Sequence, residues 1–353
     1  MANLSHSQPA EWSPHDACWL AWPSHRDLWG ADLAEARRAF VELCLTIADP
    51  DPVSGTSGGE HLEILVLDEH GELEAREALE GLSGLTLHRC PFGDIWLRDT
   101  GPIFVEDASG RIAAARFRFN GWGGKYILEG DEALGGRVAD MAGVPSRQYE
   151  LIAEGGALEV DGEGTCLTTR QCLLNENRNP GFDEEQVEVV LREALGVSKV
   201  VWLDEGLAND HTDGHIDNLA RFVAPGKVAC AVPSIGDPNR GVLEANRRRL
   251  EQAVDASGRR LEIVELPSPG AVLDSEGRPL PASYLNYYVA NGTVAVPVFG
   301  KATDQHALKA LSACFSNRRV VGIESKALLG GGGSLHCITQ HQPSPRTSSN
   351  KTI

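Results

Sequence analysis

The feature that most constrains this 353-residue chain is the regular return of short polar clusters along it. Asp94, Glu154 and His215 each follow a strand-like run and precede a predicted hairpin and helix, and 60 and 61 residues separate them. Cys337 lies 122 residues beyond His215, which is two more steps of the same length. Such a period indicates modules arranged about an axis, each of which delivers polar side chains to one central place.

The same period predicts where the remaining clusters lie. They are expected near residues 19–22 and near residues 284–286. Between the clusters, turn residues predict hairpins at residues 107–110, 161–164 and 291–292, the last of these an Asn-Gly pair. Residues 49–60 are predicted to form a loop, and the Ser- and Pro-rich residues 341–353 a flexible tail. The organisation predicted is a single α/β domain over residues 1–353.

Charge and cysteine usage bound the function. Lys and Arg total 32 and Asp and Glu total 50, which gives a net charge of −18. That balance argues against a nucleic-acid surface and suits a small cationic partner. Eight cysteines are far apart with no CxxC pair, a pattern typical of reduced thiols in a cytoplasm. No signal peptide is evident in the first twenty residues, and no run approaches the ~20 apolar residues of a membrane span.

A glycine-rich stretch near the end of the chain leads to a thiol. Residues 330–333 are four consecutive glycines, and Cys337 follows shortly after, before Ile338 and Thr339, which favour a short strand. Open backbone beside a cysteine suits a nucleophile, because donor N–H groups then lie close to developing charge. The alternative is an ordinary turn that precedes a buried cysteine.

His215 and Asp217 stand two residues apart at the start of a predicted strand, which would place both side chains on one face. An imidazole and a carboxylate there could carry a proton and bind a cation; the alternative is a polar strand edge. A rival hypothesis takes His211, Asp213, His215 and Asp217 as alternating ligands of one or two metal ions, as in a metal-dependent ureohydrolase.

The cluster at Asp94 combines a carboxylate with the aromatic ring of Trp96, and this combination suits a guanidinium or ammonium guest. The alternative is a surface pair between Asp94 and Arg98. Arg98 and Asp99 are interpreted as structural, turn-fixing residues. Glu154 precedes two glycines that allow close approach of the backbone. On a strand, His336 would point away from the face that carries Cys337.

Six motifs together resemble the agmatine deiminase family of guanidine-modifying enzymes. They are DIWLRDTGP (94–102), EGG (154–156), LTTRQCLLNENRNPG (167–181), TDGHIDN (212–218), ASYLNYYVANG (282–292) and GGGSLHCIT (331–339). The resemblance runs from about Trp12 to Gln340. It implies a five-bladed α/β propeller of repeated modules, in agreement with the period of about 60 residues.

The resemblance also implies roles for residues at matching positions. Cys337 would be the nucleophile, His215 the general acid and base, Asp94 and Asp217 the carboxylates that hold the guanidinium, and Glu154 the partner that orients His215. Trp96, Gly332 and Gly333 are predicted to contact the substrate. The chain departs from the family pattern at Ser334, where Asn is common, and at His211, where an acidic residue is common.

The activity implied is hydrolytic deimination of a small alkylguanidine, most simply agmatine, through a covalent amidino-thioether. No metal or organic cofactor is required, and a homodimer is expected from the family. The alternatives that remain are deimination of arginine or of peptidyl-arginine, and the metal-dependent ureohydrolase.

Overall fold

The structure, a computed structural model, describes residues 6–50 and 58–346. Four of its sheets share one three-stranded topology, in which the first strand pairs antiparallel with the second and the second pairs parallel with the third. They comprise β4 (Ile103–Glu106), β5 (Ile112–Arg118) and β6 (Ser146–Ile152); β7 (Glu159–Val160), β8 (Thr165–Thr169) and β9 (Lys199–Leu203); β10 (Ala220–Ala224), β11 (Lys227–Val232) and β12 (Glu262–Pro267); and β15 (Tyr288–Val289), β16 (Thr293–Val298) and β17 (Arg319–Glu324). The predicted hairpins connect the first two strands of three of these sheets.

The fifth sheet joins the two ends of the chain. Strand β18 (Gln340–Pro343) pairs antiparallel with β1 (His15–Ala21), which is followed in parallel by β2 (His61–Val66) and β3 (Leu85–Arg89). The prediction of a flexible tail from residue 341 is therefore wrong for residues 341–343, because their backbone pairs with β1. Residues 347–353, like residues 51–57 of the predicted loop, lie outside the described residues.

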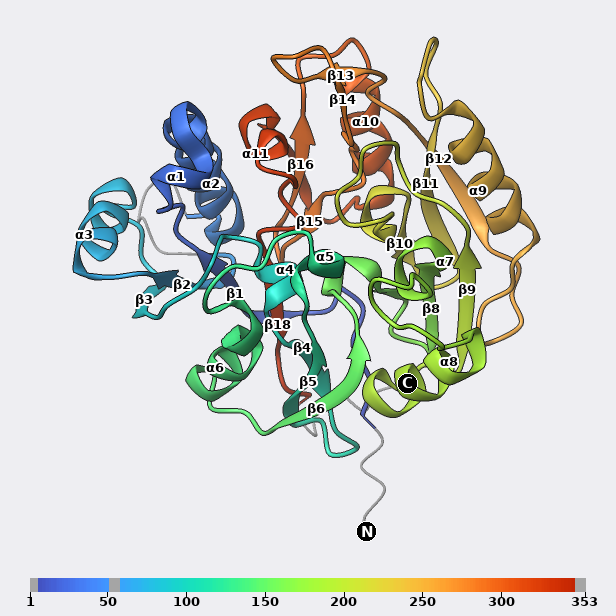
Figure 1. The fold of residues 1–353 in the computed structure, drawn as a ribbon, viewed down its shortest axis with the longest axis horizontal. Coiled ribbons are helices and arrows are strands. Elements are labelled where there is room, and N and C mark those ends of the chain that lie inside the picture. Colours follow the sequence, from blue (N-terminus) through green and yellow to red (C-terminus); the bar gives the residue numbers. More distant parts are fainter. Residues whose placement is uncertain (1–5, 51–57, 347–353) are drawn as a thin grey trace.

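The five sheets follow one another around the centre of the molecule, with the longer helices toward the outside and the short helices α4 and α5 near the centre (Figure 1). The helices are α1 (Arg26–Trp29), α2 (Leu33–Ala48), α3 (Glu69–Ala78), α4 (Leu97–Thr100), α5 (Gly121–Gly124), α6 (Leu134–Met141), α7 (Arg170–Leu173), α8 (Glu184–Leu195), α9 (Arg240–Gln252), α10 (Asp304–Cys314) and α11 (Lys326–Gly330), and a hairpin joins β13 (Val272–Leu273) to β14 (Pro279–Leu280). The α/β class and the repeated module are thus observed. No pairing among the described strands joins the five sheets into one closed sheet.

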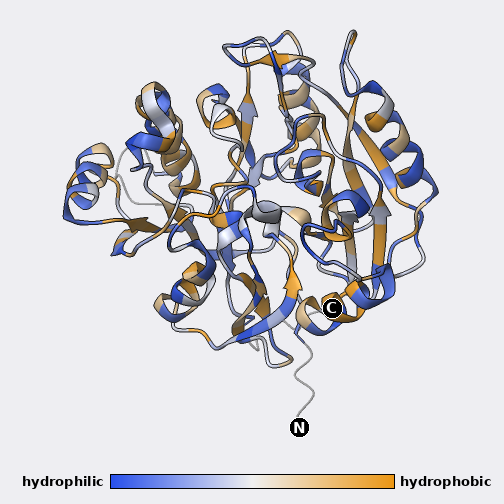
Figure 2. Cartoon of the chain, viewed as in Figure 1, coloured by the Kyte–Doolittle hydropathy of each residue, from blue (hydrophilic) through white to orange (hydrophobic). Residues whose placement is uncertain are grey.

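Local sequence explains where these helices begin and which side they bury. Asp183 and Gln186 form a reciprocal capping box at the start of α8, and Gly196 ends that helix in the left-handed conformation. In α2, Phe40, Leu43 and Ile47 recur at helical spacing and are fully buried. Figure 2 shows this pattern along the chain, with apolar residues on the strands and polar residues on the outer sides of the helices.

Each polar cluster stands within ten residues before the first strand of one sheet. Asp94 precedes β4, Glu154 precedes β7, His215 precedes β10, Asn286 precedes β15 and Cys337 precedes β18. The cluster predicted near residues 284–286 is therefore present. The one predicted near residues 19–22 is wrong, because the fifth sheet takes its cluster from the C-terminal strand. Residues 19–22 are instead fully buried core.

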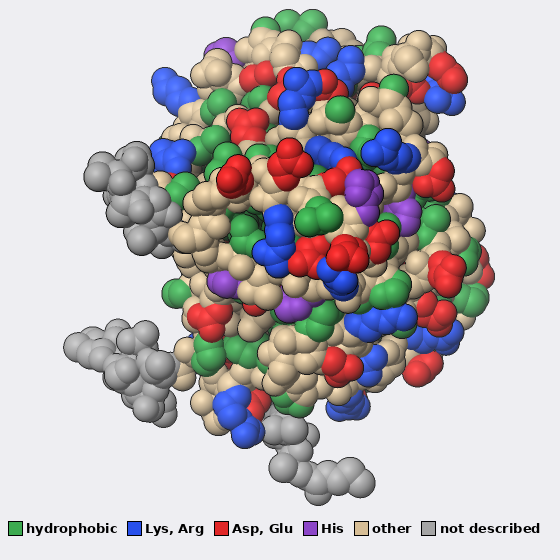
Figure 3. Space-filling view, turned by 90° about the vertical axis from the view of Figure 1, so that its left-hand side faces the viewer, with side chains coloured by type: hydrophobic (Ala, Val, Ile, Leu, Met, Phe, Trp, Pro, Cys, Tyr) green, Lys and Arg blue, Asp and Glu red, His purple; other side chains and the backbone are tan. Residues whose placement is uncertain are grey.

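The structure also bears on the class of protein. None of the described helices has the length and apolar character needed to cross a bilayer. All eight cysteines are free thiols, as expected from their spacing. On the face drawn in Figure 3, acidic and basic side chains are interspersed among the described residues, without a continuous basic surface of the kind that binds nucleic acid.

Candidate active site

A cavity of about 250 Å³ opens where the polar clusters meet. It contains five of the residues predicted to act in the site. These are Asp94, Trp96, Gly332, Gly333 and Cys337. The remaining lining comes from neighbouring aromatic, aliphatic, polar and glycine residues, which are Leu28, Trp29, Asp99, Trp122, Tyr126, Leu128, His211, Thr212, Gly330 and Gly331.

Asp94 is a buried carboxylate held by two indole rings. Trp29 donates its Nε1–H to Oδ1 over 2.9 Å, and Trp96 donates to Oδ2 over 2.8 Å. Burial raises the pKa of Asp94, and the two indole donors oppose that rise. The predicted alternative, a surface pair with Arg98, is not formed, since Arg98 is itself buried and pairs with Glu11. Asp94 thus presents an oriented carboxylate between aromatic rings, which is the setting that a planar cation prefers.

Cys337 lies in a turn before β18 and not on the strand that the sequence predicts. Its thiol contacts both ends of one side-chain amide, because Asn286 Nδ2 donates to Sγ over 3.3 Å and the thiol donates to Oδ1 over 3.4 Å. Gly333 is required beside it, since a Cβ at that position would stand 2.6 Å from the Trp96 ring and 2.9 Å from Cys337 Cβ. The glycine-rich stretch therefore leaves room for the thiol to face the cavity.

His215, Asp217 and Asp99 meet around the backbone of Gly156. A Cβ placed on Gly156 would lie 2.6 Å from His215 Nδ1 and 3.0 Å from both Asp217 Oδ2 and Asp99 Oδ1. His215 and Asp217 do not themselves line the cavity, but Asp99 does, so all three groups adjoin it. Both ring nitrogens of His215 and Oδ1 of Asp217 are buried without a hydrogen-bond partner among the described residues. Such unpaired groups are costly unless a ligand or water engages them.

Glu154 lies on the other side of the His215 ring. Its Oε2 is 3.5 Å from His215 Nε2, and Arg178 Nε donates to both carboxylate oxygens over 2.9 and 3.0 Å. Burial alone would raise the pKa of Glu154, but Arg178 and His215 outweigh it and lower the pKa. The thiol of Cys172 is 3.8 Å from Glu154 Oε2. Glu154 is thereby held ionised next to the imidazole.

The electrostatics of this centre set the resting protonation of two groups. Burial, followed by the charges of Asp217 and Asp99, raises the pKa of the Cys337 thiol well above its usual value. For His215, burial lowers the pKa, but Asp99 and Glu154 are among the groups that raise it, and the net result is well above the usual value. The resting site therefore holds a neutral thiol and a protonated imidazole.

The rival hypothesis of a metal cluster formed by His211, Asp213, His215 and Asp217 is wrong. Asp213 and Gly214 have left-handed backbone (φ of 62° and 91°), so this segment turns and its alternate side chains do not share a face. Asp213 pairs with Lys125 and Arg178, and exposed His211 bonds to Tyr126 over 2.9 Å. His215 and Asp217 come together through the short 3₁₀ turn Ile216–Asn218, not through a strand.

A different group of donors lies close enough to hold a metal ion. Atoms of Glu154, Cys172 and His215 lie within 4.8 Å of one another. Two features argue for proton transfer instead of ion binding there. Arg178 already places a cation against Glu154, and burial raises the pKa of Cys172 and so keeps its thiol neutral.

Several site residues were not predicted. Asp99, interpreted as structural, lines the cavity and accepts hydrogen bonds from Trp122 Nε1 (2.8 Å) and Gly156 N (3.0 Å). Trp122 adopts φ of 52°, an unfavourable conformation for a bulky residue and one that aims its indole at Asp99. Asn286 could have been assigned from the module period, whereas nothing in the sequence pattern marks Trp122.

Comparison with known proteins gives consistent results. The Porphyromonas-type peptidyl-arginine deiminase family matches residues 7–343. An agmatine deiminase of Stutzerimonas stutzeri (strain A1501) is 37% identical over 361 residues, which cover 96% of this chain and 95% of that protein. The agmatine deiminase of Enterococcus faecalis, in a structure described as catalysing its reaction, superposes with a TM-score of 0.87 at 30% identity, covering 96% of each chain. A C. jejuni agmatine deiminase variant with substrate bound gives a TM-score of 0.87 at 26% identity, covering 98% of this chain and 99% of that one.

Proposed function

The chain belongs to the Porphyromonas-type peptidyl-arginine deiminase family, and from that premise we propose that it hydrolyses agmatine to N-carbamoylputrescine and ammonia by way of Cys337. Relatives that are agmatine deiminases match it over nearly the whole length, which makes it a hydrolase acting on the C–N bonds of a linear amidine. The observation that supports the assignment of the site is that Asp94 and Cys337 line one small cavity together with Asp99, and that His215 and Asp217 adjoin Asp99 around Gly156.

The first chemical step is attack by sulfur on the guanidinium carbon. Asp94 and Asp217 hold the planar cation by charge-assisted hydrogen bonds and place its carbon over Sγ. The bound positive charge offsets the carboxylates that raise the pKa of the thiol, so that Cys337 releases its proton to solvent when substrate binds. A C–S bond forms, and protonated His215 donates its proton to the departing nitrogen, which leaves as ammonia.

The second step releases the product. The amidino-thioether on Cys337 is attacked by water, which His215, now neutral, deprotonates. The C–S bond breaks, the leaving sulfur takes the hydroxyl proton of the tetrahedral intermediate, and the ureido product departs. Cys337 is then a neutral thiol again, and His215 keeps the proton that it took from water, so both groups are in their starting forms. Glu154 stabilises the imidazolium form of His215 in each cycle, since its carboxylate faces Nε2.

The charge of the entrance favours a substrate with a cationic tail. Tyr126, His211 and Gly330 line both the small cavity and an adjoining hollow of about 1210 Å³, so they form the rim between the two. The outer hollow is lined by five carboxylates and three basic side chains: Asp32, Glu35, Glu42, Asp274, Glu324, Arg38, Arg278 and Lys326. Two of the basic side chains, Arg38 and Arg278, are paired with acids of the same hollow. This negative balance suits the terminal ammonium of agmatine better than the carboxylate of free arginine.

A panel of three substrates tests the assignment. Ammonia release is measured with agmatine, free arginine and a blocked arginyl peptide. We expect agmatine to have the highest kcat/KM, by at least tenfold. Equal or faster turnover of the peptide would move the assignment to peptidyl-arginine deimination, and no release from any of the three would remove it.

Two further properties remain proposals. A homodimer is expected from the family resemblance, and light scattering in solution tests it. A cytoplasmic location is proposed on the support of the free cysteines, and cell fractionation tests it.

A further inference from the structure

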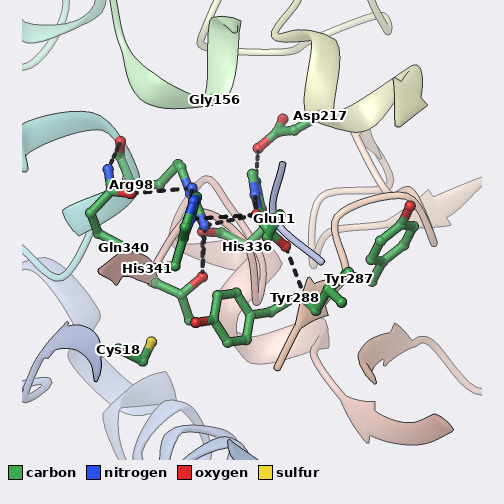
Figure 4. Close-up of polar contacts among 12 residues, drawn as sticks. Glu11, Cys18, Arg98, Gly156, Asp217, Tyr287, Tyr288, His336, Gln340 and His341 are labelled. Atoms are coloured by element: carbon green, nitrogen blue, oxygen red, sulfur yellow. Dashed lines mark hydrogen bonds and ion pairs between the residues drawn. The ribbon is translucent and has the colours of Figure 1, made fainter. Parts of the chain in front are cut away.

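A chain of buried charged groups continues from Asp217 away from the cavity (Figure 4). We propose that Glu11, acting through His336, is a positioning residue of the reaction: the Glu11–His336–Asp217 chain fixes the Asp217 carboxylate so that its Oδ1 faces the guanidinium. This inference rests on the proposed function and deepens it. None of the steps assigned above uses Glu11 or His336.

Glu11 stands near the start of the described chain, before β1, and yet its carboxylate is the centre of this network. Oε1 accepts from the backbone N–H of Val289 over 2.9 Å and lies 3.0 Å from Arg221 Nη2. Oε2 lies 2.8 Å from His336 Nε2 and accepts from Arg98 Nη2 over 3.2 Å. Four segments distant in sequence therefore converge on one buried carboxylate.

His336 connects Glu11 to the site. Its Nε2 lies 2.8 Å from Glu11 Oε2 and its Nδ1 lies 2.8 Å from Asp217 Oδ2. Carboxylates only accept, so both bonds are made when each ring nitrogen carries a hydrogen and the imidazole is cationic. The ring is then held at both ends, because a flip or rotation would break both bonds at once. Its backbone N–H donates to Asn286, which also contacts the thiol of the next residue, Cys337.

The two carboxylate oxygens of Asp217 consequently differ in their hydrogen bonding. Oδ2 is occupied by His336, whereas Oδ1 is buried and unpartnered among the described residues. Burial alone would raise the pKa of Asp217, but its hydrogen bond with His336 is the chief contribution that lowers it, and the net shift is downward. Asp217 is thus both oriented and kept ionised by His336, and His336 keeps that arrangement only while Glu11 accepts from its far nitrogen.

Loss of this support should affect orientation more than affinity. In Glu11→Gln, the amide offers a single acceptor oxygen to donors that now share it, so His336 loses its fixed orientation and Asp217 can rotate. Asp94 still binds the cation, but the guanidinium carbon is no longer held over Sγ. Because a misplacement of the order of 1 Å can cost about 10²-fold in rate, we expect kcat to fall roughly 10- to 100-fold while KM changes less than about threefold.

The matched control is Glu60→Gln. Glu60 is also a fully buried carboxylate and accepts from His15 (3.0 Å), Tyr288 (2.6 Å) and the backbone of Asn291 (3.0 Å), but it does not contact His336. Both variants should lower the melting temperature, whereas only Glu11→Gln should lower kcat. If Glu11→Gln yields no folded protein, Glu11→Asp, which keeps the charge and shortens its reach, replaces it with the same expected split.

A double-mutant cycle shows whether Glu11 acts through His336. His336→Gln should lower kcat on its own, and Glu11→Gln should have little further effect on kcat in that background. Additive losses of kcat in the double variant, or a kcat of Glu11→Gln equal to that of wild type, would overturn the proposal. The proposed function would still stand in either case, because the wild-type enzyme is active. Wild-type enzyme without ammonia release would instead fail the proposed function itself, before any variant is compared.

Discussion

The sharpest structural prediction concerns Gly156, because three site residues leave no room for a Cβ at this position. An added Cβ would lie 2.6 Å from His215 Nδ1, well inside the ~3.5 Å of ordinary contact, so the two must separate by about 0.9 Å. A displacement of this size at a reacting group costs about 10²-fold in rate, or ~2.7 kcal/mol of barrier. We therefore expect Gly156→Ala to lower kcat/KM for agmatine about 100-fold, measured by ammonia release.

The matched control for Gly156→Ala is Gly322→Ala. The atoms nearest to a Cβ on Gly322, in β17, would be those of the Val298 and Leu308 side chains, at 3.0 to 3.4 Å. Both substitutions crowd a packed position, buried at Gly156 and half-buried at Gly322, at a cost of roughly 1–3 kcal/mol in the free energy of unfolding. Full activity in Gly156→Ala, or an equal loss of activity in Gly322→Ala, would refute the reasoning, because crowding at His215 would then not be the cause.

Three further predictions follow from the electrostatics and the entrance. Burial and the carboxylates of Asp217 and Asp99 raise the pKa of Cys337, so its thiolate fraction at pH 7.5 is below that of a free thiol. The rate of alkylation by iodoacetamide should therefore be low at pH 7.5 and still increase up to pH 10, as measured by peptide mass spectrometry. A rate that stops increasing below pH 8 would contradict this prediction. EDTA should leave ammonia release unchanged, whereas alkylation of Cys337 should abolish it. Loss of ammonia release with EDTA but not with alkylation would favour the metal-dependent ureohydrolase instead. His211→Glu should lower KM for agmatine about 2- to 5-fold, since one added rim charge contributes up to ~1 kcal/mol, and should not lower it for free arginine; equal KM changes for the two would contradict the proposed position of the tail.

The fold was predictable from the sequence because each module repeats the same order of elements. Asp94, Glu154 and His215 mark the start of successive sheets, and this spacing survives without any repeat of residue identity. The exception is the fifth sheet, in which β18 from one end of the chain pairs with β1 from the other. Pairing between such distant segments leaves no local pattern, which is why residues 19–22 were expected to form a cluster of their own and residues 341–343 a tail.

The residues proposed for the site could be chosen from the sequence, but their geometry could not. His215 and Asp217 do come together, yet through a 3₁₀ turn that follows left-handed Asp213 and Gly214, and alternation along the sequence cannot distinguish this turn from a strand. Partners such as Arg178 and Glu11 were missed for a physical reason. Their roles depend on which distant side chains pack against them, and such contacts carry no spacing signal.

The account depends on a covalent bond between the Cys337 sulfur and the guanidinium carbon. The most direct test is to mix the His215→Ala variant with agmatine, quench the reaction and measure the mass of the peptide that contains Cys337 by mass spectrometry. Removal of the imidazole takes away the base for the second step, so we expect that peptide to gain the mass of agmatine less ammonia if the first step proceeds, and wild-type enzyme quenched during turnover to carry the same adduct. Turnover of agmatine by wild-type enzyme with no adduct on Cys337 at any quench time, together with an active Cys337→Ser variant, would contradict the account.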